Sequence, residues 1–319
     1  MSMATGMEGS TQKIKKTGLG SALKKDFKRN YVLYLMVLPV IAFYIIFCYI
    51  PMYGVIIAFM DYDPGWGMLN SEWVGLRNFQ DFFQSIYFVR LLKNTLTISI
   101  STLVFGFPAP IIFALLINEV RNKHFSKTIK TATYLPHFIS LVVICGMIKD
   151  FTGANGIITQ LFARFGGENR AMLSNEHLFL PVYVISEIWQ KVGWDSIIYI
   201  AALTGINQEL YEACSIDGGG RWKQTVHVTI PGIMPTIIIM LILRMGGILG
   251  VGHEKIILLY NESIYSTADV ISSYVYRKGL VNANYSFATA VGLFNSVVNI
   301  IFLIAANTIS RKVTESSLW

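Results

Sequence analysis

The stretch at residues 204–231, TGINQELYEACSIDGGGRWKQTVHVTIP, decides how the chain is organised. It is the polar link between two apolar runs, roughly 178–203 and 230–250. Each run is about as long as the ~20 residues that a helix needs to cross a bilayer. A structured polar segment held between two spans lies at a membrane surface, where a soluble partner can reach it. The sequence therefore predicts a membrane protein with loop 204–231 as an exposed contact point.

This loop carries its own start and stop signals. Asn207 can cap a short helix over residues 208–216, because its side chain accepts hydrogen bonds from the first free N–H groups. The Asp-Gly-Gly-Gly run at 217–220 ends that helix, since glycine reaches positive φ without steric cost. A second amphipathic piece, 221–230, returns to the bilayer, and Pro231 is expected to break it. The pattern predicts a rigid knob, although an ordinary interfacial connector fits it equally well.

Composition supports the membrane assignment. Of 319 residues, 53% are hydrophobic and 14% are charged, whereas soluble domains carry about 25% charged residues. The mean hydropathy is +0.51. Disordered, collagen-like and coiled-coil chains are excluded, because they need polar, periodic or charge-rich sequences. The three cysteines are too few for a disulfide scaffold and lack the spacing of a metal site, so no metal is expected.

Six runs are long enough to cross a bilayer as helices. They cover roughly residues 31–60, 94–118, 130–149, 178–203, 230–250 and 286–309. The first exceeds the ~7–15-residue core of a signal peptide and is interpreted as a retained span. The third has the weakest pattern, because Pro136 and His137 fall in its first half. The expected fold is an all-α, polytopic membrane protein with six transmembrane helices within residues 31–310.

Basic residues are distributed unevenly along the chain. Of the 26 Lys and Arg, 15 lie in the N-terminal segment 1–30, in the loops after the second and fourth spans, and in the C-terminal segment 311–319. The positive-inside rule places these segments in the cytoplasm, so residues 1–30 and 311–319 are expected to be cytoplasmic tails. Topology thus explains the formal charge of +7. Membrane lipid is an expected contact, and nucleic acid is not.

Charged residues inside the fourth span point to function, because charges are costly in a bilayer. Glu187, Lys191 and Asp195 follow one another at four-residue steps, which puts them on one helical face where they can pair. Gln190 and Trp194 lie beside this row and could bind a saccharide through a planar amide and an aromatic ring. The row is interpreted either as the lining of a substrate pathway or as a self-satisfied ion-pair ladder.

Arg244 lies inside the fifth span without an oppositely charged residue within one turn of its helix. It is expected to contact a cavity or an acidic substrate, or to pair with another helix. Together with Lys191 it hints at an anionic sugar such as a uronate, although the carboxylates of span four offset that charge. His253 and Glu254, at the outer mouth of this span, are candidates for contact with a binding subunit or the substrate.

The loop at 204–231 resembles the EAA loop of ATP-binding-cassette importer permeases, whose pattern is roughly E-A-A-x-x-D-G-A, a spacer and a hydrophobic-Pro pair. The matching positions are Glu212, Ala213, Asp217, Gly218 and Pro231. Cys214 and Gly219 replace alanines of the pattern and keep both positions small. In that family the short helix inserts into a groove on the ATP-hydrolysing subunit and transmits its closure. The resemblance implies an ATPase-coupling contact made by Glu209, Glu212, Ala213, Asp217, Gly218, Gly220 and Pro231.

The resemblance covers nearly the whole chain from about residue 31. WVGLRNF at 73–79, AALTGINQELYEA at 201–213 and YSFATAVGLFNS at 285–296 are similar to carbohydrate-type permeases of the polysaccharide and oligosaccharide branch. This implies a type I importer permease that crosses a bacterial plasma (inner) membrane several times. The implied partners are a second permease subunit, usually a different chain, two copies of an ATP-binding subunit, and an extracellular or periplasmic solute-binding protein.

The sequence has no G-x-x-x-x-G-K-[ST] pattern for phosphate binding. No enzyme activity or cofactor is therefore expected on this chain, and the resemblance implies that ATP and Mg bind to the partner ATPase. An ion-coupled secondary transporter is the alternative, with Glu187 and Asp195 as a proton relay, but it leaves the EAA-like loop unexplained. An intramembrane enzyme is disfavoured, because the spans contain neither a G-x-S-x-G nor an H-E-x-x-H motif.

Overall fold

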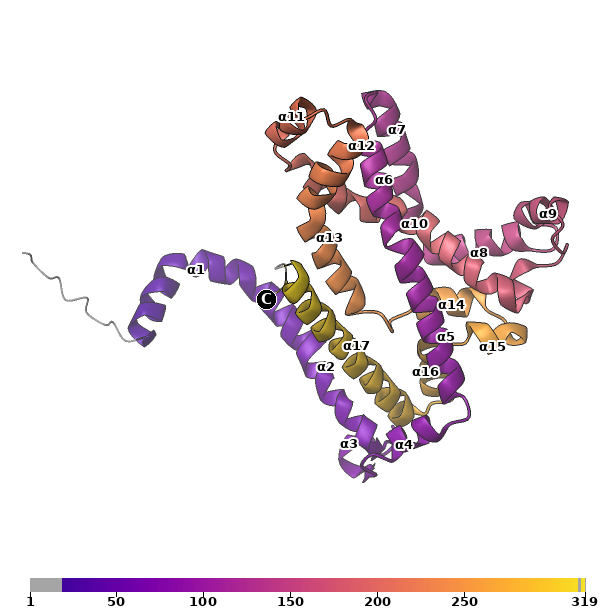
Figure 1. Cartoon of the computed structure of the whole chain (residues 1–319). Coiled ribbons are helices and arrows are strands. Elements are labelled where there is room, and N and C mark those ends of the chain that lie inside the picture. The colour runs from indigo at the N-terminus through magenta and orange to yellow at the C-terminus, as the bar shows by residue number, and fades with distance from the viewer. Residues whose placement is uncertain (1–18, 315–316, 319) are drawn as a thin grey trace, which may run out of the picture. The chain divides into compact units, whose positions relative to one another are not determined.

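A computed structural model describes residues 19–314 and 317–318 of the chain, which divides into units Met1–Ile56 and Ile57–Trp319 (Figure 1). The described part of the first unit is helical, with α1 (Leu19–Phe43), a π-helical turn (Tyr44–Tyr49), α2 (Ile50–Met52) and the start of a 3-10 segment (Tyr53–Phe59). From Phe27 to Met52 its large apolar side chains are exposed. Most of the predicted tail 1–30 lies outside the described residues.

The second unit is almost entirely helical. Among the described residues, the strands are β1 (Met60–Asp61) and β2 (Glu72–Trp73), which pair antiparallel. The first helices are α3 (Gly67–Asn70), α4 (Arg77–Gln84), α5 (Phe88–Ser101), α6 (Pro108–Asn118), α7 (Lys123–Tyr134), α8 (Leu141–Thr152) and α9 (Ile157–Arg164). They are followed by α10 (Glu176–Thr204), α11 (Gln208–Ile216), α12 (Arg221–Gln224), α13 (Ile230–Met245), α14 (His253–Leu259), α15 (Tyr265–Ala268), α16 (Ile271–Tyr276) and α17 (Tyr285–Thr314). The all-α prediction is confirmed.

Within the described residues, five helical segments are long and apolar enough to cross a membrane. They are Phe27–Phe59, Phe88–Asn118, Leu141–Arg164, Arg221–Met245 and Tyr285–Lys312. The predicted fourth span corresponds to α10, whose 29 residues rise about 1.5 Å each and so exceed the ~30 Å hydrocarbon core. α10 is not one of the five segments named above, and it contains the charged row Glu187, Lys191 and Asp195. The chain is a multi-pass membrane protein, and the count of six spans stays a prediction.

The third predicted span, 130–149, does not form one helix. α7 ends at Tyr134, a 3-10 turn covers Leu135–Phe138, and α8 begins only at Leu141. Pro136 lacks an N–H and cannot continue the hydrogen bonding of α7. The backbone then becomes extended at Ile139 and Ser140, with ψ of 136° and 144°, before α8 begins. The apolar segment in the structure starts after this break, which shifts the span toward its C-terminal side.

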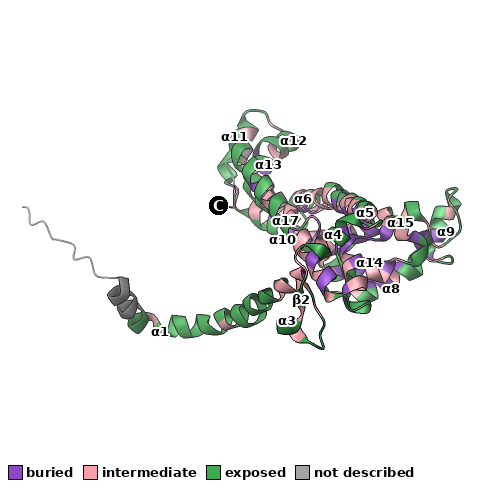
Figure 2. Cartoon of the chain, turned by 90° about the horizontal axis from the view of Figure 1, so that it is seen from below, coloured by how far each residue is buried: buried purple, intermediate pink, exposed green. Residues whose placement is uncertain are grey.

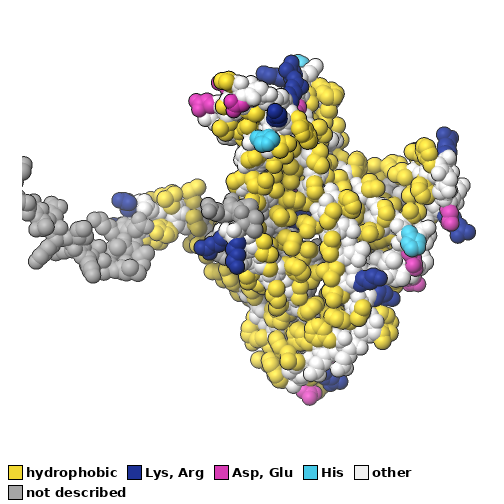
Figure 3. Space-filling view, in the orientation of Figure 1, with side chains coloured by type: hydrophobic (Ala, Val, Ile, Leu, Met, Phe, Trp, Pro, Cys, Tyr) yellow, Lys and Arg dark blue, Asp and Glu magenta, His cyan; other side chains and the backbone are white. Residues whose placement is uncertain are grey.

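The loops of the second unit gather at two ends. α11 and α12 lie at one end, close to the turn between α6 and α7 (Figure 1). At the other end, the segments around α4, α8, α14 and α16 enclose two clusters of buried apolar side chains, where Figure 2 shows much of the buried surface. Figure 3 shows mostly apolar side chains between these ends. The loops assigned to one membrane side therefore lie together, while the side itself stays a prediction.

Candidate functional site

The predicted helix of loop 204–231 is confirmed at both ends. α11 begins at Gln208, and the Asn207 side chain accepts a hydrogen bond from the Glu209 N–H at 3.0 Å. The Asn207 amide also donates to the Glu209 carboxylate at 3.0 Å, so the cap fixes the first acidic side chain of the helix. The helix ends at Ile216, the residue that the sequence pattern indicates.

The glycine run closes α11 with a Schellman motif. The Gly219 N–H donates to the Cys214 carbonyl at 2.7 Å, and the Gly218 N–H donates to the Ser215 carbonyl at 3.1 Å. Gly218 has a φ of +74°, which glycine reaches without strain. Gly219 has a different reason to be glycine, because a Cβ there would lie 2.7 Å from the Cys214 carbonyl oxygen. Glycine therefore fits this position without a steric conflict, whereas a side chain requires the turn to shift.

Gly219→Ala is therefore expected to loosen the end of α11 by about 1–3 kcal/mol, as overpacking does. The neighbouring Gly220→Ala is the matched control, since a Cβ at Gly220 meets nothing within 4 Å. Hydrogen exchange of the α11 amides in the purified protein measures the difference. Equal protection in the two variants would show that the turn adapts to a side chain at Gly219.

Several large apolar side chains are exposed on this knob, defined as α11 and α12 with the turn between them. Leu210, Ile216 and Trp222 have exposed fractions of 52%, 85% and 79%. Glu212 and Ala213 are exposed beside them, and Glu212 makes no hydrogen bond or ion pair with any described residue. Large apolar groups exposed around an unpaired carboxylate are typical of a protein-binding surface.

The side of the knob that carries Tyr211 and Cys214 attaches it to the membrane helices. Tyr211 and Cys214 pack against a buried cluster contributed by α6, α10 and α13. The Tyr211 hydroxyl hydrogen-bonds the Thr229 hydroxyl at 3.1 Å, and the Gln224 amide donates to the Ser215 hydroxyl at 2.8 Å. Cys214 thus points inward rather than toward a partner. These contacts attach α11 to the segment that leads into α13 and to the cluster that contains α10.

The prediction that Pro231 breaks the helix is wrong. α13 begins at Ile230 and contains Pro231, and residues Arg221–Met245 run on as one helical segment. A π-helical turn over Thr225–Thr229 precedes the proline. Proline is tolerated in the first turn of a helix, where its missing N–H removes no bond, and the π turn supplies the register shift. The link from the knob into α13 is therefore continuous.

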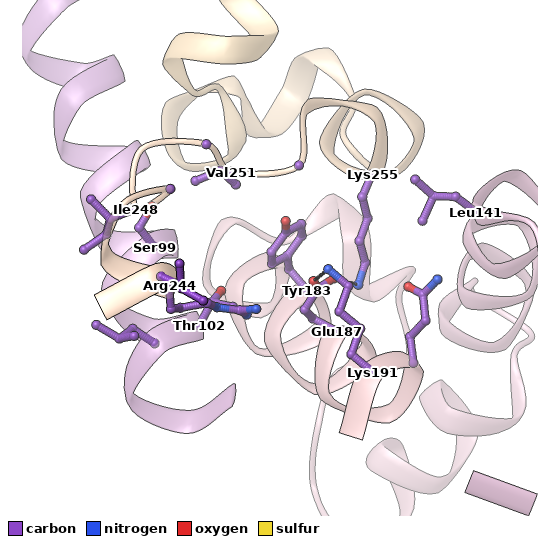
Figure 4. Close-up of a pocket in the computed structure, with 16 residues that line it drawn as sticks. Ser99, Thr102, Leu141, Tyr183, Glu187, Lys191, Arg244, Ile248, Val251 and Lys255 are labelled. Carbon is purple, nitrogen blue, oxygen red and sulfur yellow. Dashed lines mark hydrogen bonds and ion pairs between the residues drawn. The ribbon is translucent and has the colours of Figure 1, made fainter. Parts of the chain in front are cut away.

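A cavity of about 410 Å³ lies between α5, α8, α10, α13 and the start of α14 (Figure 4). Four of the predicted substrate-pathway residues line it: Glu187, Gln190, Lys191 and Arg244. The other polar side chains in the lining are Ser99, Thr102, Tyr183 and Lys255. The charged residues of the fourth and fifth spans thus meet in one space, as the pathway interpretation requires.

Glu187 is the centre of an ion network in this cavity. Its carboxylate contacts the Lys191 ammonium at 2.5 Å and the Lys255 ammonium at 2.9 Å. The predicted pairing of Glu187 with Lys191 is therefore present, while Lys255 was not anticipated. Lys255 belongs to α14, 68 residues away in sequence. The available signal was a lone lysine directly before the apolar run at residues 256–259.

Several polar atoms of the lining have no partner within the described part of the protein. The Ser99 Oγ, Thr102 Oγ1 and Gln190 Oε1 atoms are buried without a hydrogen bond. Arg244 forms no hydrogen bond or ion pair with any described residue. Buried polar groups are nearly always satisfied in folded proteins, so these atoms call for water or a polar ligand. Hydroxyl, amide and guanidinium groups suit a saccharide that carries acidic groups.

Trp194 and Asp195 are not part of the cavity lining. The Trp194 ring stacks on His137, with 4.4 Å between ring centroids and 2° between planes. Asp195 is half-buried and makes no ion pair with a described residue, so the row does not form a complete ladder. The lining residues of α10 end at Lys191, and Asp195 lies one further turn along the helix, outside the cavity.

His253 and Glu254 lie at the start of α14, and both are exposed. His253 also lines a second cavity of about 450 Å³, formed mainly by α16 and α17. The exposure is compatible with the predicted contact with a binding subunit, which stays a prediction.

Two curated relatives are similar to this chain over nearly its whole length. Protein LplB of Bacillus subtilis (strain 168) is 43% identical over 303 residues, which is 95% of each chain. The polygalacturonan/rhamnogalacturonan transport system permease protein YteP of the same strain is 42% identical over 298 residues, covering 93% of this chain and 92% of that protein.

A solved structure has the same fold. The crystal structure of a bacterial ABC transporter involved in the import of the acidic polysaccharide alginate contains a chain that is 44% identical, with a TM-score of 0.84. The match covers 92% of this chain and 99% of that one. Residues 106–315 match the family described as binding-protein-dependent transport system inner membrane component, which is more than half of the sequence. The chain belongs to this family, and it is a non-catalytic permease subunit of a binding-protein-dependent ABC importer.

Proposed function

We propose that this permease carries acidic oligosaccharides into the bacterial cytoplasm, and that the knob couples it to an ATP-hydrolysing subunit. The observation that carries the proposal is that the knob and the cavity share two helices. α10 and α13 supply Glu187, Lys191 and Arg244 to the cavity, and the same helices hold the knob between their other ends. Movement of the knob therefore changes the spacing of the charged groups in the cavity.

The coupling role is supported by the surface chemistry of the knob. Its exposed apolar side chains, Leu210 and Ile216 among them, suit a hydrophobic groove, and the unpaired Glu212 suits a basic group at the rim of that groove. The contact residues are those of the EAA-like pattern, from Glu209 to Pro231. ATP and Mg are bound by the partner, which transmits its closure through this helix.

The acidic substrate class is supported by the cavity and by the relatives. The lining has three cationic side chains and one carboxylate, so it carries an excess of two positive charges. One relative is named for polygalacturonan and rhamnogalacturonan transport, and the similar solved transporter imports alginate, an acidic polysaccharide. A chain that carries one carboxylate per sugar neutralises such a cavity, whereas a neutral oligosaccharide leaves its charge uncompensated.

The assembly that this function needs contains a second permease subunit, two ATP-binding subunits and a solute-binding protein. A related transporter has been crystallised with an alginate pentasaccharide-bound periplasmic protein. In this arrangement the knob and both termini face the cytoplasm, and the end with α14 and α16 faces outward. The exposed His253 and Glu254 are then placed to meet the binding protein.

Uptake by the purified complete importer in proteoliposomes tests the proposed function. With a galacturonate trisaccharide and the binding protein outside, uptake is expected to require internal ATP and to persist when an ionophore collapses ion gradients. Uptake without ATP that is lost with the ionophore would contradict the proposal and favour ion-coupled transport. ATP-driven uptake of neutral but not acidic trisaccharides would contradict the substrate class alone.

A further inference from the structure

The Glu187 carboxylate forms ion pairs with two lysine side chains, and these differ greatly in solvent exposure. Lys255 is 2% exposed, reaches Glu187 from α14 at 2.9 Å, and lies over the Tyr183 ring at 4.9 Å. The Lys191 side chain is 41% exposed and approaches Glu187 from the same helix, one turn away. Figure 4 shows both ammonium groups converging on the carboxylate from different sides. Lys255 is therefore a fixed partner, whereas Lys191 can turn away.

The cavity beside Lys191 offers space into which its side chain can turn. It lines the cavity together with Arg244, and Figure 4 shows the Arg244 guanidinium extending from the opposite side toward the same space. Arg244 forms no hydrogen bond or ion pair with a described residue, and the carboxylate with which its charge interacts, Asp195, lies outside the lining. An anion in this space would meet a guanidinium and a movable ammonium, which is a strong arrangement for binding a carboxylate.

We propose that Glu187 is a resident carboxylate that substitutes for the substrate's own carboxylate whenever the cavity is empty. When a uronate enters, Lys191 exchanges Glu187 for the uronate carboxylate beside Arg244, and Glu187 keeps Lys255. One ion pair breaks and one forms, so Lys191 remains paired in both states. When the substrate leaves, Lys191 returns to Glu187. The inference rests on the proposed function, because it requires an acidic saccharide.

The exchange makes Glu187 a determinant of affinity. A substrate carboxylate competes with Glu187 for Lys191. The binding free energy therefore includes only the difference between the Lys191–uronate and Lys191–Glu187 ion pairs, not the whole of the new pair. The lower affinity favours transport, because a site that binds its substrate too tightly releases it slowly. A merely structural ion pair has no such effect on affinity.

Equilibrium binding of a fluorescent galacturonate trisaccharide to the purified complete importer in nanodiscs tests this. Lys191→Met is expected to raise the Kd about tenfold, because it removes a charged partner of the ligand. Glu187→Gln is expected to lower the Kd by about the same factor, because it removes the competitor. Glu187→Asp and Lys191→Arg keep the exchanging charges and are expected to stay within about threefold of the wild type.

The directions in which Glu187→Gln and Lys191→Met change the Kd distinguish the exchange from a purely structural ion pair. If Glu187→Gln and Lys191→Met both raise the Kd, the pair holds the site together and the exchange is overturned. If Glu187→Gln does not fold, Lys191→Met carries the test at its half-exposed position, and an unchanged Kd there overturns the exchange. Failure of the proposed function has a different signature, because the wild type would then not import the trisaccharide with ATP at all.

Discussion

Glu212→Lys is expected to lower ATP-driven uptake at least about 100-fold. The substitution places a positive charge opposite the basic group that we propose on the partner ATPase, and the two repel. The Glu212 side chain is exposed and forms no hydrogen bond or ion pair with a described residue, so the substitution removes no polar interaction that stabilises the permease. The amount of ATPase subunit that co-purifies with the permease in mild detergent should fall in parallel. Thermal unfolding of the permease should not change.

Asp81→Lys is the matched control for this variant. It makes the same change in charge on an exposed residue of α4, at the other end of the second unit (Figure 1). It is expected to insert normally and to retain the ATPase subunit. Normal uptake by Glu212→Lys would refute the coupling role of the knob, and loss of the ATPase subunit from both variants would point to a general effect of charge.

The sequence predicts local structure best where the signals are local. The cap at Asn207, the glycine termination and the bounds of α11 all follow from neighbouring residues, and the structure confirms them. Pro231 was interpreted wrongly because the π turn that accommodates it has no recognisable sequence signal. The break at Pro136 was the expected weak point of the third span, but its effect on the boundaries depends on how α8 packs.

The candidate site was harder to predict, because it forms between distant segments. Four-residue spacing was enough to predict that Lys191 reaches Glu187. It could not show that Lys255 arrives from α14, or that Trp194 turns to His137 instead of the cavity. Those positions depend on how α14 and the 3-10 turn at Leu135–Phe138 pack against α10, and neither is encoded in the periodicity of α10.

Arg244→Met is expected to reduce uptake of a galacturonate trisaccharide about 10- to 100-fold, the effect of losing a charged hydrogen bond to the substrate. It should destabilise the protein little, because Arg244 forms no hydrogen bond or ion pair with a described residue and interacts with the Asp195 carboxylate only at longer range. Arg277 provides the contrast. Its guanidinium binds both Asp269 oxygens, at 2.9 and 2.6 Å, and the Asp269 side chain is fully buried.

Arg277→Met should therefore lower the thermal unfolding temperature, since it leaves the buried Asp269 carboxylate without its main partner. Uptake assays and thermal unfolding of the two variants separate the roles. If Arg244→Met instead unfolds as early as Arg277→Met, Arg244 pairs with another helix in the assembled transporter and is not a substrate group. If it unfolds like the wild type and loses uptake, the unpaired guanidinium in the cavity serves the substrate, because no structural function remains for it.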